Sequence, residues 1–158
     1  MLMFGVFAIR PGVDSIALDR TEEWLYFAPV TDEKMWRVRV KDLNNAALSA
    51  QELKNKVEAF ADKTMSDGIT IDDANNIYIS DLEHSAIMKM RPDGTMQTLY
   101  KDKKLRWPDG FSFAPNGWLY LTASALQEVI AKPDQYIKEK GPYQIFKLKT
   151  DSSAYPGH

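Results

Sequence analysis

Apolar and polar residues alternate in short stretches along this chain of 158 residues, as they do in strands with one buried face. The stretch SDGITIDDANNIYISD, residues 66–81, shows two alternating runs on either side of a polar turn at Asn75 and Asn76. Two other stretches, VDSIALDRTEEWLYFAPV from Val13 and PDGFSFAPNGWLYLTAS from Pro108, have the same arrangement. Each stretch therefore predicts a β-hairpin.

The three stretches are copies of one repeat. Asp14, Asp67 and Asp109 stand near their heads, and a tyrosine follows each aspartate eleven or twelve residues later. Further alternating runs come after each hairpin, namely KMWRVRV, SAIMKMRPDGTMQTLY and YQIFKLKT. A repeat of roughly 40 to 50 residues with four antiparallel strands is typical of a propeller blade.

The predicted fold is therefore all-β: half a β-propeller of about three four-stranded antiparallel blades with short helical insertions. One domain spans residues 1–158, with blades at approximately 5–47, 57–100 and 105–150. The alternation predicts that the following residues pack between or within blades: Ile16, Leu18, Leu25, Phe27, Ile69, Ile71, Ile77, Ile79, Phe111, Phe113, Leu119 and Leu121.

Two insertions interrupt the repeat, one between the first two copies and one within the third blade. The first has capping-box spacing at Ser49 and Glu52, followed by Leu53, Val57 and Phe60 at helical intervals, which predicts a helix. The end of this pattern also fits the outer strand of a blade. In the other insertion, ALQEVIAKPDQYIKEKGP, Pro133 should end any helix that begins near Ala125.

The amino-acid composition excludes several classes of binding partner. A formal net charge of −2, spread along the chain, offers no basic face for nucleic acid and no polybasic patch for a membrane. With no cysteine there is neither a disulfide framework nor a thiolate metal site. The apolar start MLMFGVFAIRPG is short and lacks a charged segment ahead of it. We therefore expect a soluble protein without a signal peptide, and a cytoplasmic location is slightly favoured.

The motifs SDGITID, NNIYISDLEHSAIMKMRPDGT and WPDGFSFAPNGWLYLTAS resemble those of the major royal jelly/Yellow and gluconolactonase-like six-bladed propellers. A bacterial royal-jelly-like branch is most similar, from about Gly12 to Lys149. The family has six blades and this chain has room for about three, so it resembles the C-terminal half of such a protein.

For the lactonase relatives, the resemblance implies a divalent cation, Ca²⁺, Mg²⁺ or Mn²⁺, at the centre of the channel. Asp14 falls where an Asn ligand is usual, and Asp67 falls on the Asp ligand, which the resemblance also suggests as the catalytic base. The Glu ligand comes from an early blade and has no counterpart here. A water molecule on such a metal could attack a lactone carbonyl.

Each candidate residue also has a structural interpretation. An Asp-Gly pair ahead of a strand is common turn chemistry, which applies to Asp67 and Asp109 alike. Trp107 could contact an aromatic ligand at the channel mouth or pack against a neighbouring blade. The SDLEHS loop should lie on the same face, which makes Asp81 and His84 candidates for ligand binding beside Asp109 and Trp107, although an exposed histidine is usually incidental.

Two functions follow from these residues. The preferred interpretation is a small-molecule-binding propeller, with an amine or aromatic ligand in the central channel, as in the royal-jelly/Yellow group. The alternative is a metal-dependent hydrolase of lactones or esters, as in gluconolactonase. Two aspartates without the Glu form an incomplete coordination sphere, which is the feature that separates the two.

Three blades form an open half ring, so the first and last sheets should each present an uncovered apolar face. We expect a homodimer in which two copies close a six-bladed ring. The alternative is a monomer, or a piece of a longer protein, whose faces are covered by the segment MLMFGVF and by the tail after Lys149.

Overall fold

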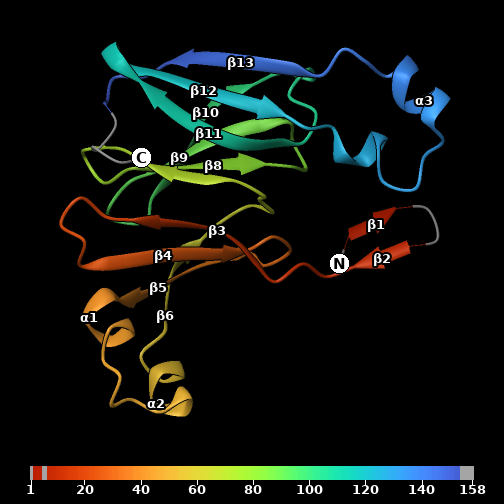
Figure 1. Ribbon diagram of the computed structural model, residues 1–158. Helices are drawn as coiled ribbons and strands as arrows, with labels where there is room; N and C mark the ends of the chain where they lie inside the picture. Colours follow the sequence, from red (N-terminus) through yellow and green to blue (C-terminus); the bar gives the residue numbers. More distant parts are fainter. Residues whose placement is uncertain (1, 5–6, 154–158) are drawn as a thin grey trace.

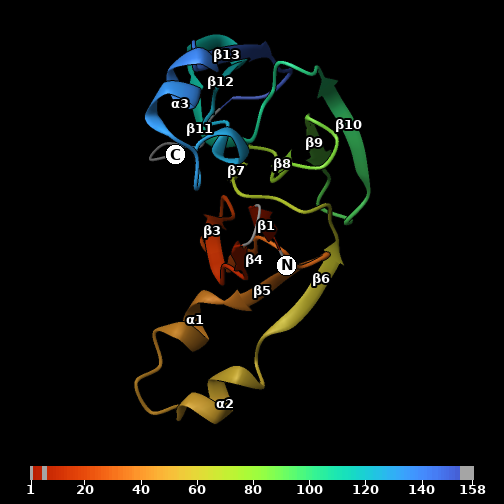
Figure 2. The same ribbon diagram turned by 90° about the vertical axis from the view of Figure 1, so that its right-hand side faces the viewer.

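Three antiparallel sheets follow one another along the chain and fan out from a common axis in the computed structural model (Figures 1 and 2). The structure describes residues 2–4 and 7–153; Met1, Gly5, Val6 and residues 154–158 lie outside the description. The all-β half-propeller predicted from the sequence is confirmed. Within the described residues, no helix is both long enough and apolar enough to cross a membrane.

The first blade consists of β3 (Val13–Leu18), β4 (Trp24–Pro29), β5 (Lys34–Arg39) and β6 (Glu58–Asp62), paired in that order. Strand β6 pairs with β5, so the first sheet extends to residue 62, whereas the sequence analysis predicted that the second blade begins at residue 57. The apolar residues after the first insertion thus form the outer strand of the first blade. This is the second of the two interpretations that the sequence allowed for them, the first being a helix.

The second blade consists of β7 (Ile69–Ile71), β8 (Ile77–Asp81), β9 (Ala86–Met90) and β10 (Met96–Lys101). It lies between the other two blades, and every residue of β7, β8 and β9 is buried. Ile77 and Ile79 pack towards the first blade, while Tyr78 packs against Phe113 of the third. Both faces of this sheet are therefore interfaces between blades.

The third blade has three strands rather than the predicted four: β11 (Pro108–Ala114), β12 (Trp118–Ala123) and β13 (Gln144–Lys149). The insertion between β12 and β13 takes up twenty residues, 124–143, and only residues 150–153 of the description follow β13. These residues bind elsewhere: the N–H of Thr150 donates to the carbonyl of Gly117, and the carbonyl of Ser153 accepts from the N–H of Asp73.

The insertions contain the short helices. In the first, α1 (Val40–Leu43) precedes α2 (Ala50–Lys54), and the predicted capping box of Ser49 and Glu52 is present at the start of α2. In the second, only a single 3-10 turn, η2 (Leu126–Glu128), comes before Pro133, and α3 (Asp134–Glu139) begins directly after it. Another 3-10 turn, η1 (Pro115–Gly117), joins β11 to β12.

Of the twelve residues predicted for the core, seven are buried: Ile69, Ile71, Ile77, Ile79, Phe113, Leu119 and Leu121. Leu18, Leu25, Phe27 and Phe111 are partly buried. The prediction for Ile16 was wrong, because this side chain is 60% exposed. In the first blade it is Ala17, Tyr26 and Ala28 that pack against the second blade, whereas Ile16 lies on the opposite face, which no blade in the described residues covers.

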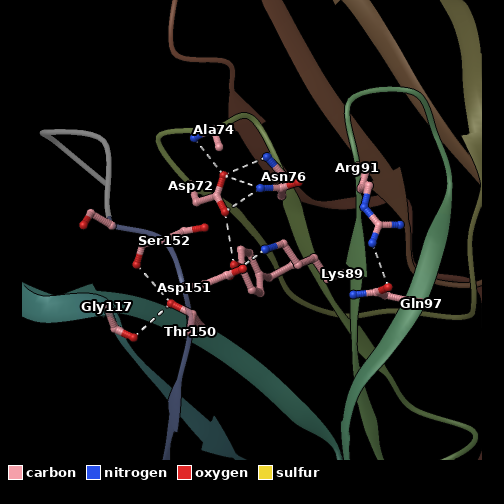
Figure 3. Close-up of polar contacts among 12 residues, drawn as sticks. Asp72, Ala74, Asn76, Lys89, Arg91, Gln97, Gly117, Thr150, Asp151 and Ser152 are labelled. Atoms are coloured by element: carbon pink, nitrogen blue, oxygen red, sulfur yellow. Dashed lines mark hydrogen bonds and ion pairs between the residues drawn. The ribbon is translucent and has the colours of Figure 1, made fainter.

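A hub of polar contacts ties the blades together at the turn between β7 and β8 (Figure 3). The fully buried carboxylate of Asp72 accepts hydrogen bonds from the backbone N–H groups of Ala74 and Asn76, the Asn76 side chain and the Tyr78 hydroxyl. The backbone N–H of Arg20, from the first blade, donates to the side chain of Asn75 in the same turn. On the other side, the buried Lys89 ammonium donates to Asp151, which follows the third blade.

Replacement of Asp72 should test how much these hydrogen bonds contribute to the free energy of unfolding. We expect Asp72→Ala to lower the free energy of unfolding by at least about 3 kcal/mol, because several buried donors would lose their acceptor. Asp93→Ala is the matched control: Asp93 also accepts from a backbone N–H and a side chain, both on Thr95, but in an exposed turn. Urea unfolding measures both, and equal losses would contradict the assigned role of Asp72.

Candidate functional site: a carboxylate cluster at the propeller axis

The three repeat aspartates lie at the beginning of the three innermost strands. Asp14 is the second residue of β3, Asp67 lies two residues before β7, and Asp109 is the second residue of β11. Strands β3, β7 and β11 run side by side along the axis of the fan (Figure 2). Equivalent positions in successive blades are thereby brought together, as the repeat predicts.

A glycine makes this approach possible. A Cβ atom built on Gly68 would lie 1.6 Å from the backbone carbonyl oxygen of Asp109, a distance at which no side chain fits. Because residue 68 has no side chain, the backbone ahead of β7 rests directly against that of β11. Asp67 and Asp109 are thus held close together by the backbone itself.

The backbone around Asp67 is fixed by a serine of the neighbouring strand. The N–H groups of Asp67 and Gly68 both donate to Ser80 Oγ, at 3.0 and 2.9 Å. In a common Asp turn, the carboxylate accepts from backbone N–H groups about two residues later. In the described residues the carboxylate of Asp67 accepts no such bond, so it is available for other partners.

Those partners are an indole and another carboxyl group. Trp107 Nε1 donates to Asp67 Oδ2 at 2.5 Å. The carboxyl group of Asp14 is close enough to that of Asp67 to raise its pKa. The backbone of Trp107 has a positive φ of 55°, which is uncommon for a residue other than glycine. This conformation directs the indole towards Asp67.

The cluster favours protonation. The pKa of Asp67 is raised from 3.8 to about 7, chiefly because the side chain is buried and because it is hydrogen-bonded to Asp14; the indole of Trp107 opposes this shift, and the charges of Asp109 and Asp14 add to it. Burial, together with the charge of Asp14, also raises the pKa of Asp109. Among the described residues, none of the three carboxylates forms a salt bridge.

A hairpin that the sequence did not predict covers this end of the axis. Strands β1 (Leu2–Phe4) and β2 (Phe7–Ile9) pair antiparallel, and Phe4 contacts Trp107 with ring centroids 5.7 Å apart. Leu2 and Phe4 are buried against Val30, with four partly buried side chains around them: Met65, Leu82, Trp107 and Ile130. The roof is therefore built from loops of all three blades. Part of the segment MLMFGVF thus covers the axis rather than a face of a blade; Met1, Gly5 and Val6 lie outside the described residues.

The geometry does not fit a divalent cation as it stands. One oxygen of Asp67 already accepts from the indole N–H of Trp107, and the raised pKa of this carboxyl group disfavours the ionised form that a metal ion requires. In residues 2–4 and 7–153, no group of three or more His, Cys, Asp or Glu side chains is arranged to hold a metal ion. Metal binding by Asp14 and Asp67 stays a prediction.

Asp81 and His84 form a separate pair. Asp81 accepts from the backbone N–H groups of Glu83 and His84, and its carboxylate lies 2.9 Å from His84 Nδ1. The pair lines a cavity of about 280 Å³ together with Thr64 and residues of β9 and β10. Asp81 therefore organises its own loop, and a role of this pair in ligand binding stays a prediction.

Two features of the site were missed from the sequence. Ser80 occupies an ordinary strand position, and nothing in the sequence indicates that its hydroxyl caps the turn before β7. The hairpin could have been suspected from the apolar runs on either side of Gly5. A buried lysine was also missed: Lys63 donates to the carbonyls of Asp32 and Thr64, and burial lowers its pKa to about 8.

The fan of antiparallel blades with carboxylates at its axis defines a β-propeller protein, of which this chain forms one half. The chain belongs to the major royal jelly protein family, whose sequence pattern it matches over residues 5–153. The resemblance seen in the sequence is thereby confirmed. No curated protein sequence matches the chain.

Solved structures of propellers are similar in fold. A gluconolactonase from Xanthomonas campestris has a TM-score of 0.64 at 15% identity, over 92% of this chain and 46% of that one. Regucalcin from Agrobacterium tumefaciens, a calcium-binding protein, has a TM-score of 0.63 at 20% identity, over 90% and 47% of the two chains. A luciferin-regenerating enzyme has a TM-score of 0.61 at 15% identity, over 90% and 46%. The chain thus spans about half the length of these structures, and the likeness concerns the fold alone.

The contact at Gly68 yields a sharp test of this geometry. Gly68→Ala should lower the free energy of unfolding by at least about 3 kcal/mol, because the new methyl group overlaps a backbone atom that cannot move without separating two blades. Gly12→Ala is the control, since a Cβ at Gly12 meets nothing within 4 Å. Urea unfolding should show little change for Gly12→Ala, and a similarly small change for Gly68→Ala would refute the close approach of β7 and β11.

The raised pKa of Asp67 predicts a pH-dependent gain in stability for Asp67→Asn. A carboxyl group whose pKa is higher in the folded state stabilises the fold fully below its unfolded value, 3.8, and this contribution is lost as the pH rises towards about 7. Asparagine cannot ionise, so the melting temperature of the variant relative to wild type should rise between about pH 4 and pH 8. We expect a gain of several degrees at the upper end, since ~1 kcal/mol corresponds to roughly 2–4 °C for a domain of this size.

Asp134→Asn serves as the control for this experiment, because Asp134 is exposed at the start of α3. Its difference from wild type should be small and should not follow the same pH curve. Thermal unfolding by circular dichroism gives the curves. A constant difference for Asp67→Asn across the pH range would show that Asp67 ionises normally.

Proposed function

We propose that the protein binds a small organic cation, an amine, in the cluster formed by Asp14, Asp67, Asp109 and Trp107. The observation that supports this proposal is the carboxylate of Asp67. It is 8% exposed, close to two other carboxyl groups, and it does not cap its own turn. A positive ligand would stabilise the ionised form of this group, which the protein alone disfavours.

The surroundings suit an amine better than a bare metal ion. The face of an aromatic ring attracts a cation, and Trp107 lies directly beside the carboxylates. Its indole N–H already occupies one oxygen of Asp67, which reduces the oxygen ligands available to Ca²⁺ or Mg²⁺. An ammonium group needs fewer oxygens, and the carbon skeleton of an organic amine could also contact the apolar roof formed by Leu2 and Phe4.

The hydrolase interpretation has one observation in its favour. A carboxylate with a pKa of about 7 is well matched to general-base catalysis near neutral pH. The fold is also similar to that of a gluconolactonase. For this chain, hydrolysis of a lactone is the second candidate, and the binding experiment must be able to separate it from amine binding.

Titration calorimetry with an aryl-alkyl amine and with its neutral alcohol analogue tests the first proposal. We expect the amine to bind and the alcohol to produce no heat of binding. The affinity for the amine should be about tenfold higher at pH 8 than at pH 6, because the ionised fraction of a group with a pKa of about 7 changes by that factor. Asp67→Asn should abolish the pH dependence, and Asp134→Asn should preserve it.

The same titration with Ca²⁺, Mg²⁺ and Mn²⁺ supplies the contrasting result. Heat with a metal ion but with no amine, accompanied by release of acid from a sugar lactone, would favour the hydrolase. Equal binding of the amine and the alcohol would show that the carboxylates do not recognise the ligand, and amine binding would then be rejected.

A further inference from the structure

The first blade leaves an apolar groove open. Ile16, Leu25 and Phe27 lie on the face of its sheet that points away from the second blade, and they line a groove of about 430 Å³. Leu43 and Leu53, from the insertion with α1 and α2, form the other wall of the groove. Of the ten residues that line it, only Lys54 is charged.

The last blade is open on its far side too. Ser112, Tyr120, Thr122 and Ile145 line a second, smaller hollow of about 250 Å³ on the face away from the second blade. Phe111 and Leu121 also border this hollow, but they pack against the second blade. Ile145 is 74% exposed, the most of any large hydrophobic side chain in the described part of the chain. So exposed a side chain on the outward face of a sheet is typical of a surface that another element covers.

Most of the exposed large hydrophobic side chains lie on these two open faces. Among the side chains whose exposure the structure describes, eight large hydrophobic ones are exposed. Val13, Ile16 and Leu43 line the groove of the first blade, and Tyr120 and Ile145 line the hollow of the last. The remaining three are Ile9, Tyr100 and Tyr143. The exposed apolar residues thus concentrate on the faces at which a propeller continues into its next blade.

We propose that a second copy of this chain covers both faces and closes a ring of six blades. The similar propeller structures are about twice as long as this chain, which spans 46% to 47% of their length. Two copies with three blades each would supply six blades for one ring. The open faces lie at the two ends of the fan, below β4 and β5 and beside β12 and β13 (Figures 1 and 2). A two-fold axis then sets the last blade of each copy against the first blade of the other.

The partner copy also completes the channel. Asp14, Asp67 and Asp109 line only half of the axis in one chain, and the second copy places an equivalent set opposite them. This inference rests on the fold and on the open faces, and it does not depend on the proposed amine binding.

Light scattering on the purified chain is the first test. We expect a mass of twice 18.0 kDa for the wild type. Ile145→Glu should give a mass near 18.0 kDa with an unchanged circular dichroism spectrum, because the exposed side chain makes little contribution to the fold of one chain. Tyr100→Gln, which alters an exposed side chain on the outer strand β10, is the control and should stay dimeric. A monomeric wild type, or a dimer that tolerates Ile145→Glu, would overturn the proposal.

Disulfide trapping defines the junction, because the chain has no cysteine of its own. Ile16→Cys and Ile145→Cys are prepared as separate variants, mixed, and oxidised. We expect a covalent dimer in the mixture and none in either variant alone, since each junction joins position 16 of one copy to position 145 of the other. Covalent dimers in the separate variants, or none in the mixture, would reject this arrangement of blades.

Discussion

The contact between the backbone of Gly68 and the carbonyl of Asp109 is the constraint on which the site depends. It sets the distance between β7 and β11, and with it the separation of the aspartates that precede or begin these strands. Carboxyl groups brought together in this way destabilise the fold when they are ionised. The cohesion of the blades must offset that cost. The apolar contacts on both faces of the second blade and the hub around Asp72 provide it at a distance from the site.

The aspartates in this chain fall into two groups that the sequence alone does not separate. Asp19, Asp72 and Asp81 accept hydrogen bonds from backbone N–H groups two to five residues later, so their carboxylates stabilise turns. Asp67 precedes a glycine, as turn aspartates often do, yet in the described residues its carboxylate accepts from the indole of Trp107 and from no backbone N–H. A carboxylate that is buried and released from this structural task is the strongest indication of a binding role in this half-propeller.

The sequence predicted the fold well where alternation and turn chemistry agree. The hairpins, the capping box at Ser49 and the burial of the second blade all follow from local patterns. It failed where the outcome depends on what lies next to a sheet. Ile16 alternates like a core residue but is exposed, because burial on that face requires a blade that the described residues do not supply. In the described residues the last blade has three strands, because residues 150–153 after β13 bind Gly117 and Asp73.

For the site, the repeat register correctly brought the three aspartates to one axis. The pKa of Asp67 and of Asp109 is raised chiefly by burial, and the repulsion expected from that placement adds to it. The aromatic partner was foreseen as a candidate, but the bond from Trp107 to Asp67 was not, since it depends on a positive φ at the tryptophan. The contacts of Leu2 and Phe4 with the loops around them could not be predicted from the sequence for a similar reason. These contacts join the start of the chain to loops of all three blades, and sequence periodicity carries no information about such distant pairs.

Closure of the ring and binding of a cation would be thermodynamically coupled. In a single chain the axis is open on one side, and water can solvate part of the charge on Asp14, which is exposed. A second half ring would remove that water and bring further carboxylates near, which raises the free energy of the ionised cluster. A bound cation lowers it again and would therefore favour the closed ring. By the reciprocity of linked equilibria, the closed ring would bind the cation more tightly than the open half by the same factor.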